Sequence, residues 1–505
     1  MAGALPENAG PARAQLAAGR PALVWRKLVA DTETPVGAAL KLIEPGRGDF
    51  LLESVEGGSV RGRYSLLGLD PDLLFRATGH AAEVNRAWRH DRDAFVPLPG
   101  DSLAELRALA DSCRIEVPAA LPPALACLVG YFGYETIGLV ENLPRARGES
   151  ELHVPDMLFA RPTLILVFDG LSDELFCIAP LWADGTDPGR AVERAGERID
   201  GALRRLGENA PPAVREFALP ELALEPAMPA ADYERMVLAA KEYIAAGDIF
   251  QVVLAQRFTC PFPLPPFALY RALRRVNPSP FLYFLDLPGF AVVGSSPEIL
   301  VRVRDGEVTI RPIAGTRPRG QTEEADREAE ASLLADPKEC AEHLMLLDLG
   351  RNDVGRVAAA DSVKVTASFT IERYSHVMHI VSNVVGRLDP SKDALDALFA
   401  GFPAGTVSGA PKIRACQIIA ELEPETRGAY AGGVGYFAPD GSVDSCIVLR
   451  TAVVKDGVMH VQAGAGIVAD SDPAYEQREC EAKAGALIAA AREAARVAGE
   501  AGFGQ

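Results

Sequence analysis

Two Glu-x-x-Glu pairs lie far apart in the chain, at Glu339/Glu342 and at Glu476/Glu479, each within a run of helical periodicity. Residues three positions apart are neighbours on one face of a helix. If the two helices meet, four carboxylates gather and raise one another's pKa unless a cation neutralises them. A hard divalent ion with oxygen ligands meets that need. The pattern therefore predicts either a Mg²⁺ site between two helices or, as is usual for such pairs, two solvated helix faces.

The composition of the chain predicts a soluble globular protein with two domains or two lobes. It has 505 residues, of which 48% are hydrophobic. The net charge of −18 makes nucleic acid and an anionic membrane poor partners. Neither a signal peptide nor an apolar run of about 18 residues is evident. Eight scattered cysteines without a Cys-x-x-Cys pair predict reduced thiols and a cytoplasmic location.

Shifts in composition predict four segments along the chain. Residues 1–21 are rich in Ala, Gly and Pro and are expected to form a mobile tail. Short β-prone stretches between turn signals predict an N-terminal lobe over 22–206. Five prolines within 207–230 predict a linker, and residues 231–492 are expected to form the second and larger domain.

The second domain alternates helical and β-prone patterns. A β-prone run at 249–258 follows the first helix, and a hairpin is expected around the Asp305–Gly306 turn. Three antiparallel strands joined by Asp-Gly turns are expected over 434–468. Helices are expected at about 232–247, 323–350, 391–401, 411–423 and 474–497. Antiparallel sheets with helices on their outer faces define an α+β fold.

Two glycine-containing segments are candidates for binding an anion. Gly464 and Gly466 end a β-prone run, where backbone N–H groups are open to a ligand; the alternative is a tight turn. The segment from Gly405 to Lys412 opens a helix but lacks the spacing of a Walker A loop. Its Thr406 hydroxyl either holds an anion or a leaving group, or belongs to an ordinary helix start.

Two polar residues interrupt apolar runs. His379 follows Val377 and Met378, where a histidine is more often a hydrogen-bonded core residue than a catalyst. Arg450 lies in Ile-Val-Leu-Arg-Thr-Ala-Val-Val and is expected inside a strand. An arginine among apolar neighbours requires an anionic partner, either a ligand or an internal carboxylate.

Longer motifs carry a resemblance to a known family. In chain order they include GDIFQVVLAQRF, SSPEIL, PIAGTRPRG, AEHLMLLDLGRNDVGRV, ERYSHVMHIVS, FPAGTVSGAPKIRA, CIVLRTA and VQAGAGIVADSDP. Together they resemble the chorismate-utilising enzymes over about 22–490, and within them the anthranilate synthase branch. The resemblance implies two stacked sheets with the active site in a cleft between two lobes. It also implies an oxo-acid-lyase that forms anthranilate and pyruvate in the first committed step of tryptophan biosynthesis.

The resemblance implies a role for each candidate binding residue. Glu342 and Glu479 would bind Mg²⁺ directly, with Glu339 and Glu476 acting through water, a division that suits an ion that keeps several waters. The ring carboxylate of chorismate would be held by the ion and by Gly464, Gly466 and Lys483. The enolpyruvyl carboxylate would be held by Tyr430 and Arg450, in a pocket also lined by Gly315, Thr316 and Thr406.

The chemistry implied by the resemblance has two steps. Ammonia adds at C2 as the C4 hydroxyl leaves, giving aminodeoxyisochorismate, and pyruvate is then eliminated. Glu298 suits the acid that protonates the leaving hydroxyl, and His379 is the candidate for moving the proton in the elimination. Relatives that make aminodeoxychorismate or isochorismate carry Lys at the positions of Ala314 and Gln251. Neither residue here is a nucleophile or a base, which favours ammonia addition.

A feedback site and a partner follow from the same resemblance. Tryptophan would be bound by Ser54, Pro280, Phe281, Leu282, Val434 and Tyr436, with Leu282 a mild replacement for the usual Met. No cysteine has the Gly-flanked setting of a class I glutaminase nucleophile. Ammonia is therefore expected from a separate glutamine amidotransferase subunit, in a heterotetramer of two large and two small subunits.

Two other interpretations stay open at this point. The chain is either a synthase that stops at aminodeoxyisochorismate or makes aminodeoxychorismate, or a catalytically inert subunit that senses tryptophan. Retention of Glu342, Glu479, Arg450 and Lys483 argues against the inert subunit, because such a chain has no use for them.

Overall fold

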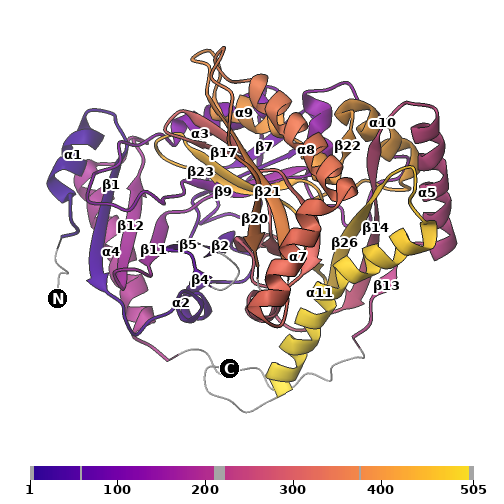
Figure 1. Ribbon diagram of the computed structural model, residues 1–505. Helices are drawn as coiled ribbons and strands as arrows, with labels where there is room; N and C mark the ends of the chain where they lie inside the picture. The colour runs from indigo at the N-terminus through magenta and orange to yellow at the C-terminus, as the bar shows by residue number, and fades with distance from the viewer. Residues whose placement is uncertain (1–4, 57–59, 210–221, 375–376, 500–505) are drawn as a thin grey trace.

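Figure 1 shows the computed structural model of the chain, which describes residues 5–56, 60–209, 222–374 and 377–499. Two large β-sheets dominate it, and helices flank them. Within the described residues, every pairing between named strands of these sheets is antiparallel. The predicted α+β fold of antiparallel sheets with flanking helices is confirmed.

The first sheet runs through both halves of the chain. Its N-terminal part has the order β1 (Ala22–Val29), β12 (Glu174–Leu181), β11 (Leu164–Asp169), β5 (Tyr64–Leu69) and β2 (Asp49–Glu53). It continues with β15 (Phe281–Leu287), β16 (Phe290–Ser296), β25 (Thr451–Lys455), β26 (Val458–Ile467), β14 (Gln251–Pro261) and β13 (Glu225–Pro226), while β22 (Gly409–Ala410) pairs with β14. The β2–β15 pairing therefore joins the two halves of the sequence.

The second sheet also combines both halves. Its C-terminal part has the order β19 (Ile313–Pro318), β21 (Val377–Arg387), β18 (Glu307–Ile310), β17 (Ile299–Arg304), β24 (Val443–Ile447) and β23 (Gly433–Phe437), with β20 (Lys364–Arg373) beside β21. It continues through β9 (Leu128–Phe132), β10 (Met157–Arg161), β6 (Leu73–Thr78), β7 (Ala81–Asn85) and β8 (Val96–Pro97). The segments on either side of the predicted linker thus share both sheets. A short separate ribbon pairs β3 (Val55–Glu56) with β4 (Val60–Arg61).

An apolar layer lies between the two sheets. Phe50 and Tyr283 enter it from the first sheet, and Tyr131 and Leu158 enter it from the second; none is more than 3% exposed. The ring of Tyr131 meets that of Phe290 edge to face, with centroids 6.1 Å apart. Burial of apolar area at about 25 cal/mol per Å² makes this layer the main force that stacks the sheets.

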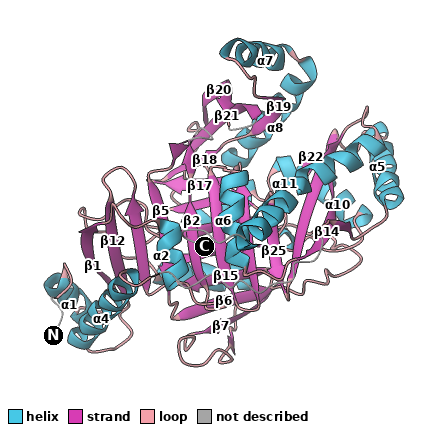
Figure 2. Cartoon of the chain, turned by 90° about the horizontal axis from the view of Figure 1, so that it is seen from below, coloured by secondary structure: helices cyan, strands magenta, loops and turns pink. Residues whose placement is uncertain are grey.

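Helices cover the outer faces of the sheets. Figure 2 shows α2, α6 and α11 lying across one face of the first sheet. On that sheet lie α2 (Pro35–Leu42), α4 (Pro188–Leu206), α5 (Ala230–Ala245), α6 (Pro266–Val276), α10 (Lys412–Leu422) and α11 (Pro473–Gly499). On the second lie α3 (Ser102–Ser112), α7 (Glu323–Ala335), α8 (Pro337–Gly355) and α9 (Ala394–Gly401). The 3₁₀ turns of the described residues are η1 (Tyr134–Leu139) and η2 (Gly405–Val407).

The N-terminal tail and the linker differ from the sequence predictions. Ala9–Ala17 form helix α1, which packs on α4 and buries Ala12 and Leu16. Apolar contact with α4 thus orders part of the segment predicted as a tail. Residues 210–221 of the predicted linker lie outside the described residues, and the β13 segment pairs with β14.

The helical pattern at 323–350 proves to be two helices, α7 and α8. Asp336 lies at the junction, and its side chain accepts hydrogen bonds from the backbone N–H groups of Lys338 and Glu339. Pro337 occupies the first turn of α8, where its missing N–H group has no effect on the helix. An N-cap followed by proline therefore restarts the helix in the middle of a continuous periodic pattern.

Strand predictions fail where the chain crosses from one sheet to the other. The apolar stretch at 290–303, which leads into the expected hairpin, breaks at Pro297–Glu298, between β16 of the first sheet and β17 of the second. The run at 443–455 breaks after β24, so the expected three strands over 434–468 are four. Arg450 was predicted inside a strand, but it lies in this second crossing with φ +48°. Apolar residues continue on both sides of each crossing, so the pattern does not mark it.

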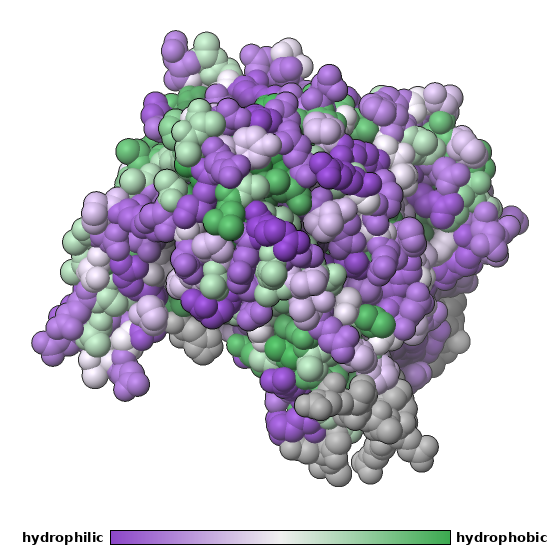
Figure 3. All heavy atoms as spheres, turned by 90° about the vertical axis from the view of Figure 1, so that its right-hand side faces the viewer, coloured by the Kyte–Doolittle hydropathy of each residue, from purple (hydrophilic) through white to green (hydrophobic). Residues whose placement is uncertain are grey.

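Much of the viewed surface is hydrophilic (Figure 3). Figure 3 shows the side of the molecule that carries α5 and α10, where apolar residues are dispersed among polar ones. In the part of the chain that the structure describes, no helix has the length and apolar character needed to cross a membrane.

Candidate active site

Helices α8 and α11 bring the two Glu-x-x-Glu pairs into one electrostatic cluster. Burial raises the pKa of Glu342, and the charges of Glu339 and Glu479 raise this pKa further. Burial likewise raises the pKa of Glu476, together with the neighbouring Glu479. The carboxylates therefore repel one another across the two helices. Such repulsion is expected where two helices meet, and not for two separate solvated helix faces.

Cations from the protein offset part of this repulsion. Arg317 donates to Glu339 at 3.0 Å, and Lys483 donates to Glu479 at 2.6 Å. Across the described ranges, no three His, Cys, Asp or Glu side chains converge closely enough to form a metal-binding group. The donor chemistry of Glu342 and Glu479 nevertheless fits a hard ion that binds few protein ligands and keeps several waters.

The two glycines of β26 allow close approach of side chains from other elements. A Cβ atom on Gly464 would lie 2.9 Å from the Tyr430 hydroxyl, and one on Gly466 would lie 2.5 Å from Nε2 of Gln251. Nζ of Lys483 donates to the carbonyl of Gly464 at 2.9 Å. Both glycines lie within a paired strand rather than a tight turn, so the close-approach interpretation is the one that fits.

Glu298 lies at the first crossing and is 7% exposed. Burial raises its pKa to about 8, although Thr406 and Arg450 both favour the charged form. The Thr406 hydroxyl donates to Oε1 of Glu298 at 3.2 Å. The N-cap of α10 is Pro411. The Thr406 hydroxyl therefore does not cap this helix, and it binds the Glu298 carboxyl group instead. A neutral carboxylic acid in this position is able to donate a proton at neutral pH.

His379 lies on β21, opposite Thr316 of β19. Its Nδ1 is 3.0 Å from the carbonyl oxygen of Gly315 and 3.1 Å from the Thr316 hydroxyl. Burial lowers the pKa of His379 to about 4, so the ring is neutral at pH 7. A carbonyl accepts only, so Nδ1 carries the proton and Nε2 keeps a free electron pair. Gly315 has φ +73°, and a Cβ there would lie 3.2 Å from Oε2 of Glu339.

Arg450 joins these groups electrostatically. Its charge favours the ionised form of Glu298 and disfavours a charged His379, while burial lowers the pKa of Arg450 itself. Among the described residues, neither a hydrogen bond nor an ion pair engages its guanidinium group. The internal salt bridge considered as one alternative is thus not seen in the described part of the chain, and the group is available to a ligand anion.

The sequence did not single out Arg427, which binds segments next to the candidate site. It is 1% exposed on its side chain and pairs with Glu423 at 2.5 Å. It also donates to the carbonyls of Val407 and Val253, next to Thr406 and on β14 respectively. Its guanidinium lies 5.6 Å from the Tyr430 ring. The only sequence signal was an arginine three residues before Tyr430.

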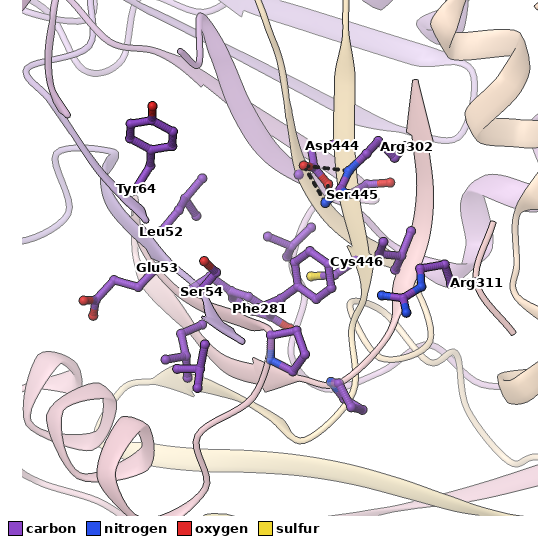
Figure 4. Close-up of a pocket in the computed structure, with 18 of the residues that line it drawn as sticks. Leu52, Glu53, Ser54, Tyr64, Phe281, Arg302, Arg311, Asp444, Ser445 and Cys446 are labelled. Carbon is purple, nitrogen blue, oxygen red and sulfur yellow. Dashed lines mark hydrogen bonds and ion pairs between the residues drawn. The ribbon is translucent and has the colours of Figure 1, made fainter. Parts of the chain in front are cut away.

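A cavity of about 830 Å³ lies apart from the glutamate cluster, because none of the four glutamates lines it. Figure 4 shows Ser54 and Phe281 beside this space, with Cys446 nearby and Arg302 paired to Asp444. All of the residues predicted for effector binding line it: Ser54, Pro280, Phe281, Leu282, Val434 and Tyr436. The sequence thus predicted which distant segments meet at one cavity.

Comparison of the chain with known proteins identifies its family. The profile of the chorismate binding enzyme family matches residues 62–489. The chain belongs to this family. Anthranilate synthase component 1 of Cereibacter sphaeroides is 55% identical over 492 residues, covering 96% of this chain and 98% of that protein. The Thermus thermophilus protein of the same name is 47% identical, covering 92% of this chain and 97% of its own length. The resemblance inferred from the motifs is confirmed.

Solved structures of the family agree with the fold. Anthranilate synthase component I from Streptococcus pneumoniae superposes with a TM-score of 0.73 at 36% identity, covering 85% of this chain and 92% of that one. MenF, the menaquinone-specific isochorismate synthase of Escherichia coli, has a TM-score of 0.68 at 20% identity and covers 95% of this chain and 99% of its own. The second comparison supports the fold alone. The chain is thus an enzyme of the chorismate-utilising class, grouped with anthranilate synthase component I proteins.

Proposed function

We propose that this chain is the large subunit of an anthranilate synthase, an oxo-acid-lyase that converts chorismate and ammonia to anthranilate and pyruvate. The observation that carries the proposal is the meeting of a neutral buried acid, Glu298, with an unpaired cation, Arg450, and a neutral imidazole, His379. These groups lie in a protein whose relatives are named anthranilate synthase component 1. Chorismate carries two carboxylates, which the cations and backbone N–H groups of the site would bind.

In the first step ammonia adds at C2 and the C4 hydroxyl leaves, giving aminodeoxyisochorismate. Hydroxide is a poor leaving group, so its departure requires a proton, which the carboxylic acid of Glu298 supplies. Thr406 fixes the direction of that carboxyl group through its hydrogen bond. Arg450 and Tyr430 hold the enolpyruvyl carboxylate, while Lys483 and the N–H groups near Gly464 hold the ring carboxylate.

In the second step pyruvate leaves and the ring becomes aromatic with loss of the C2 proton. His379 is positioned for this proton by its hydrogen bond to Gly315, which leaves Nε2 unprotonated. Its low pKa keeps it from being trapped in the charged form at neutral pH. Gly315 and Thr316 line the pocket beside it.

We further propose that Glu342 and Glu479 hold Mg²⁺, with Glu339 and Glu476 acting through water. The ion would neutralise the carboxylate cluster and the ring carboxylate of chorismate together. Replacement of Glu479 by Gln is expected to raise the Mg²⁺ concentration for half-maximal rate about 10–100-fold. Full activity of this variant at low Mg²⁺ would remove the metal assignment.

Ammonia is proposed to come from a glutamine amidotransferase subunit, in a heterotetramer of two large and two small subunits. All eight cysteines are free thiols, seven of them buried, which fits a cytoplasmic protein without a glutaminase nucleophile of its own. Mixing with the second subunit should make anthranilate formation depend on glutamine, and light scattering would give the stoichiometry. The cavity lined by Ser54 and Pro280 is proposed to bind tryptophan as a feedback inhibitor.

The test is product formation by the isolated chain with chorismate, Mg²⁺ and ammonium at mildly alkaline pH, resolved by chromatography. Anthranilate that disappears with EDTA supports the reaction and the metal. An amino-chorismate product without anthranilate would instead identify a synthase that stops before elimination. No consumption of chorismate, with or without the second subunit, would favour an inert tryptophan-sensing subunit.

A further inference from the structure

Tyr374 directly follows strand β20 and lies between the candidate catalytic groups and the cavity of about 830 Å³. Its ring meets the ring of His379 edge to face, with centroids 5.4 Å apart and planes at 63°. The residue is 8% exposed and is one of those that line the cavity. The same side chain therefore contacts the imidazole and borders an open space, so close packing does not hold it from every direction.

Hydrogen bonds hold Tyr374 at both ends. Its hydroxyl donates to Oε2 of Glu372 at 3.0 Å, and Oε1 of Glu372 accepts from Arg311. In the backbone, the Tyr374 N–H donates to the Val377 carbonyl at 2.8 Å, and its own carbonyl accepts from Arg319 at 2.7 Å. These four bonds fix the ring beside the cavity.

Glu372 places the tyrosine hydroxyl on the His379 side of the sheet. Glu372 of β20 lies directly opposite His379 of β21 in the strand register, and residues opposite each other share one face. Burial raises the pKa of the Tyr374 hydroxyl, and the Glu372 carboxylate raises this pKa further. The hydroxyl is therefore neutral at pH 7 and committed as a donor to Glu372. It is not a base for the C2 proton.

The direction of the His379 ring depends on more than one contact. The hydrogen bond between Nδ1 and the Gly315 carbonyl fixes one nitrogen but leaves the ring able to turn about that bond. An edge-to-face aromatic pair has a preferred tilt, so the Tyr374 ring opposes this turn. The direction in which Nε2 points is thus set by Gly315 and Tyr374 together.

We propose that Tyr374 is the positioning residue for His379 in the elimination step, an inference that rests on the proposed function. Tyr374 keeps Nε2 of His379 directed at C2 of aminodeoxyisochorismate. The C2 proton moves to Nε2, and the C2–H electrons form a ring double bond as the C3–O bond breaks. The enolate of pyruvate leaves and takes a proton from solvent. Tyr374 acts only through the imidazole, where a misplacement of about 1 Å is enough to cost about 10² in rate.

The same pair of strands provides a matched control. Phe369 of β20 meets the ring of His343 edge to face, with centroids 4.7 Å apart and planes at 73°. His343 is buried, and its Nε2 pairs with the Ser382 hydroxyl. Phe369→Leu therefore removes the same kind of ring contact as Tyr374→Leu, but from a histidine that has no part in the proposed reaction.

The experiment measures elimination alone, by supplying aminodeoxyisochorismate and following anthranilate by fluorescence. We expect Tyr374→Leu to slow this step about tenfold, which corresponds to about 1.4 kcal/mol in the barrier. Tyr374→Phe keeps the ring but loses the bond to Glu372, and it should slow the step about two- to threefold. Consumption of chorismate with ammonium should stay near wild type, so aminodeoxyisochorismate should appear among the products. Phe369→Leu should leave both rates near wild type.

A double variant distinguishes positioning from a general loss of structure. His379→Asn has no basic nitrogen to direct, so adding Tyr374→Leu to it should slow elimination no further. A general distortion of the site would instead add its own loss to that of His379→Asn, because independent effects are additive.

Four results would overturn the inference or the function on which it rests. Equal slowing by Tyr374→Leu and Phe369→Leu, an additive loss in the double variant, or unchanged elimination in both Tyr374 variants would overturn the role of Tyr374. If Tyr374→Leu does not fold, the smaller selective loss in Tyr374→Phe decides the question. A wild type that forms no anthranilate from chorismate and ammonium would refute the proposed function itself.

Discussion

Glu298 and Arg450 occupy two of the segments in which the chain crosses from one sheet to the other. The crossings are tied together, because Ser295 donates its N–H to the Arg450 carbonyl at 3.2 Å and Ile447 donates to the Glu298 carbonyl at 3.1 Å. Each residue lies between the end of a strand in one sheet and the start of a strand in the other. A buried acid and a partly buried cation thus interact electrostatically, because two neighbouring segments change sheets at the same place.

Replacing Glu298 with Gln should lower kcat about 10²–10⁴-fold, because the amide cannot protonate the leaving hydroxyl. KM for chorismate should change little, since the cations that hold the substrate carboxylates remain. Steady-state kinetics with ammonium as nucleophile provide the measurement. Thr406→Val, which removes only the hydrogen bond to Glu298, should cause a smaller loss. Retention of wild-type kcat by the Gln variant would assign proton donation to another group.

The same substitution should stabilise the protein at alkaline pH. The folded-state pKa of Glu298 is about 8, above its usual 4.5, so its contribution to the free energy of unfolding is present at low pH and lost between these values as pH rises. Glu298→Gln avoids this loss. Because each unit of pKa corresponds to about 1.4 kcal/mol, the variant should gain up to a few kcal/mol over wild type between pH 5 and pH 9.

Thermal or urea unfolding across that pH range would measure the difference between the two proteins. Glu307→Gln on the exposed end of β18 serves as the control and should follow the wild type at every pH. A stability difference that does not grow from pH 5 to pH 9 would mean that Glu298 is ionised in the folded protein.

His379→Asn should separate the two chemical steps. Asn is able to donate to the Gly315 carbonyl but has no basic nitrogen, so ammonia addition should persist while elimination slows at least about 10²-fold. Chromatography should then detect accumulated aminodeoxyisochorismate. His343→Asn, at a buried histidine that pairs with Ser382, should leave the product ratio unchanged. Equal slowing of both steps in His379→Asn would indicate a role in substrate binding instead.

The candidate site residues were chosen from the sequence because their motifs are local, whereas the structure adds contacts between distant segments. Alternating apolar residues and the Asp305–Gly306 turn were enough to predict the β17–β18 hairpin, in which both turn residues have positive φ. The pairing of Gln251 with Glu342 joins two motifs whose separation along the chain gives no sign of contact. The crossings at Glu298 and Arg450 were missed because the apolar pattern continues through them.

Ser54→Phe should weaken inhibition by tryptophan, since it places a ring in the cavity where Phe281 and Val434 also lie. The tryptophan concentration for half-inhibition should rise at least about tenfold, the equivalent of 1.4 kcal/mol of binding. The rate without tryptophan should stay within about twofold of wild type. Ser172→Phe, on an exposed turn, is the control. Undiminished inhibition of Ser54→Phe would place the effector elsewhere.

Arg427→Met should destabilise the protein by about 3–5 kcal/mol, because it leaves the Glu423 carboxylate buried without its cation. The loss also frees the carbonyls of Val407 and Val253, which the guanidinium now binds at 2.7 and 2.8 Å. Urea unfolding at neutral pH would measure it. Removing both charges, in Glu423→Gln/Arg427→Met, should restore part of the stability.

An exposed ion pair provides a reference for the loss of stability expected in Arg427→Met. Arg351 and Asp348 are 57% and 60% exposed, so Arg351→Met should cost no more than about 1 kcal/mol. If Arg427→Met were equally mild, the buried pair would contribute little to the folded state. That result would also mean that the hydrogen bond from Arg427 to the Val407 carbonyl is not needed to hold this segment. The position of the adjacent Thr406 would then depend on other contacts.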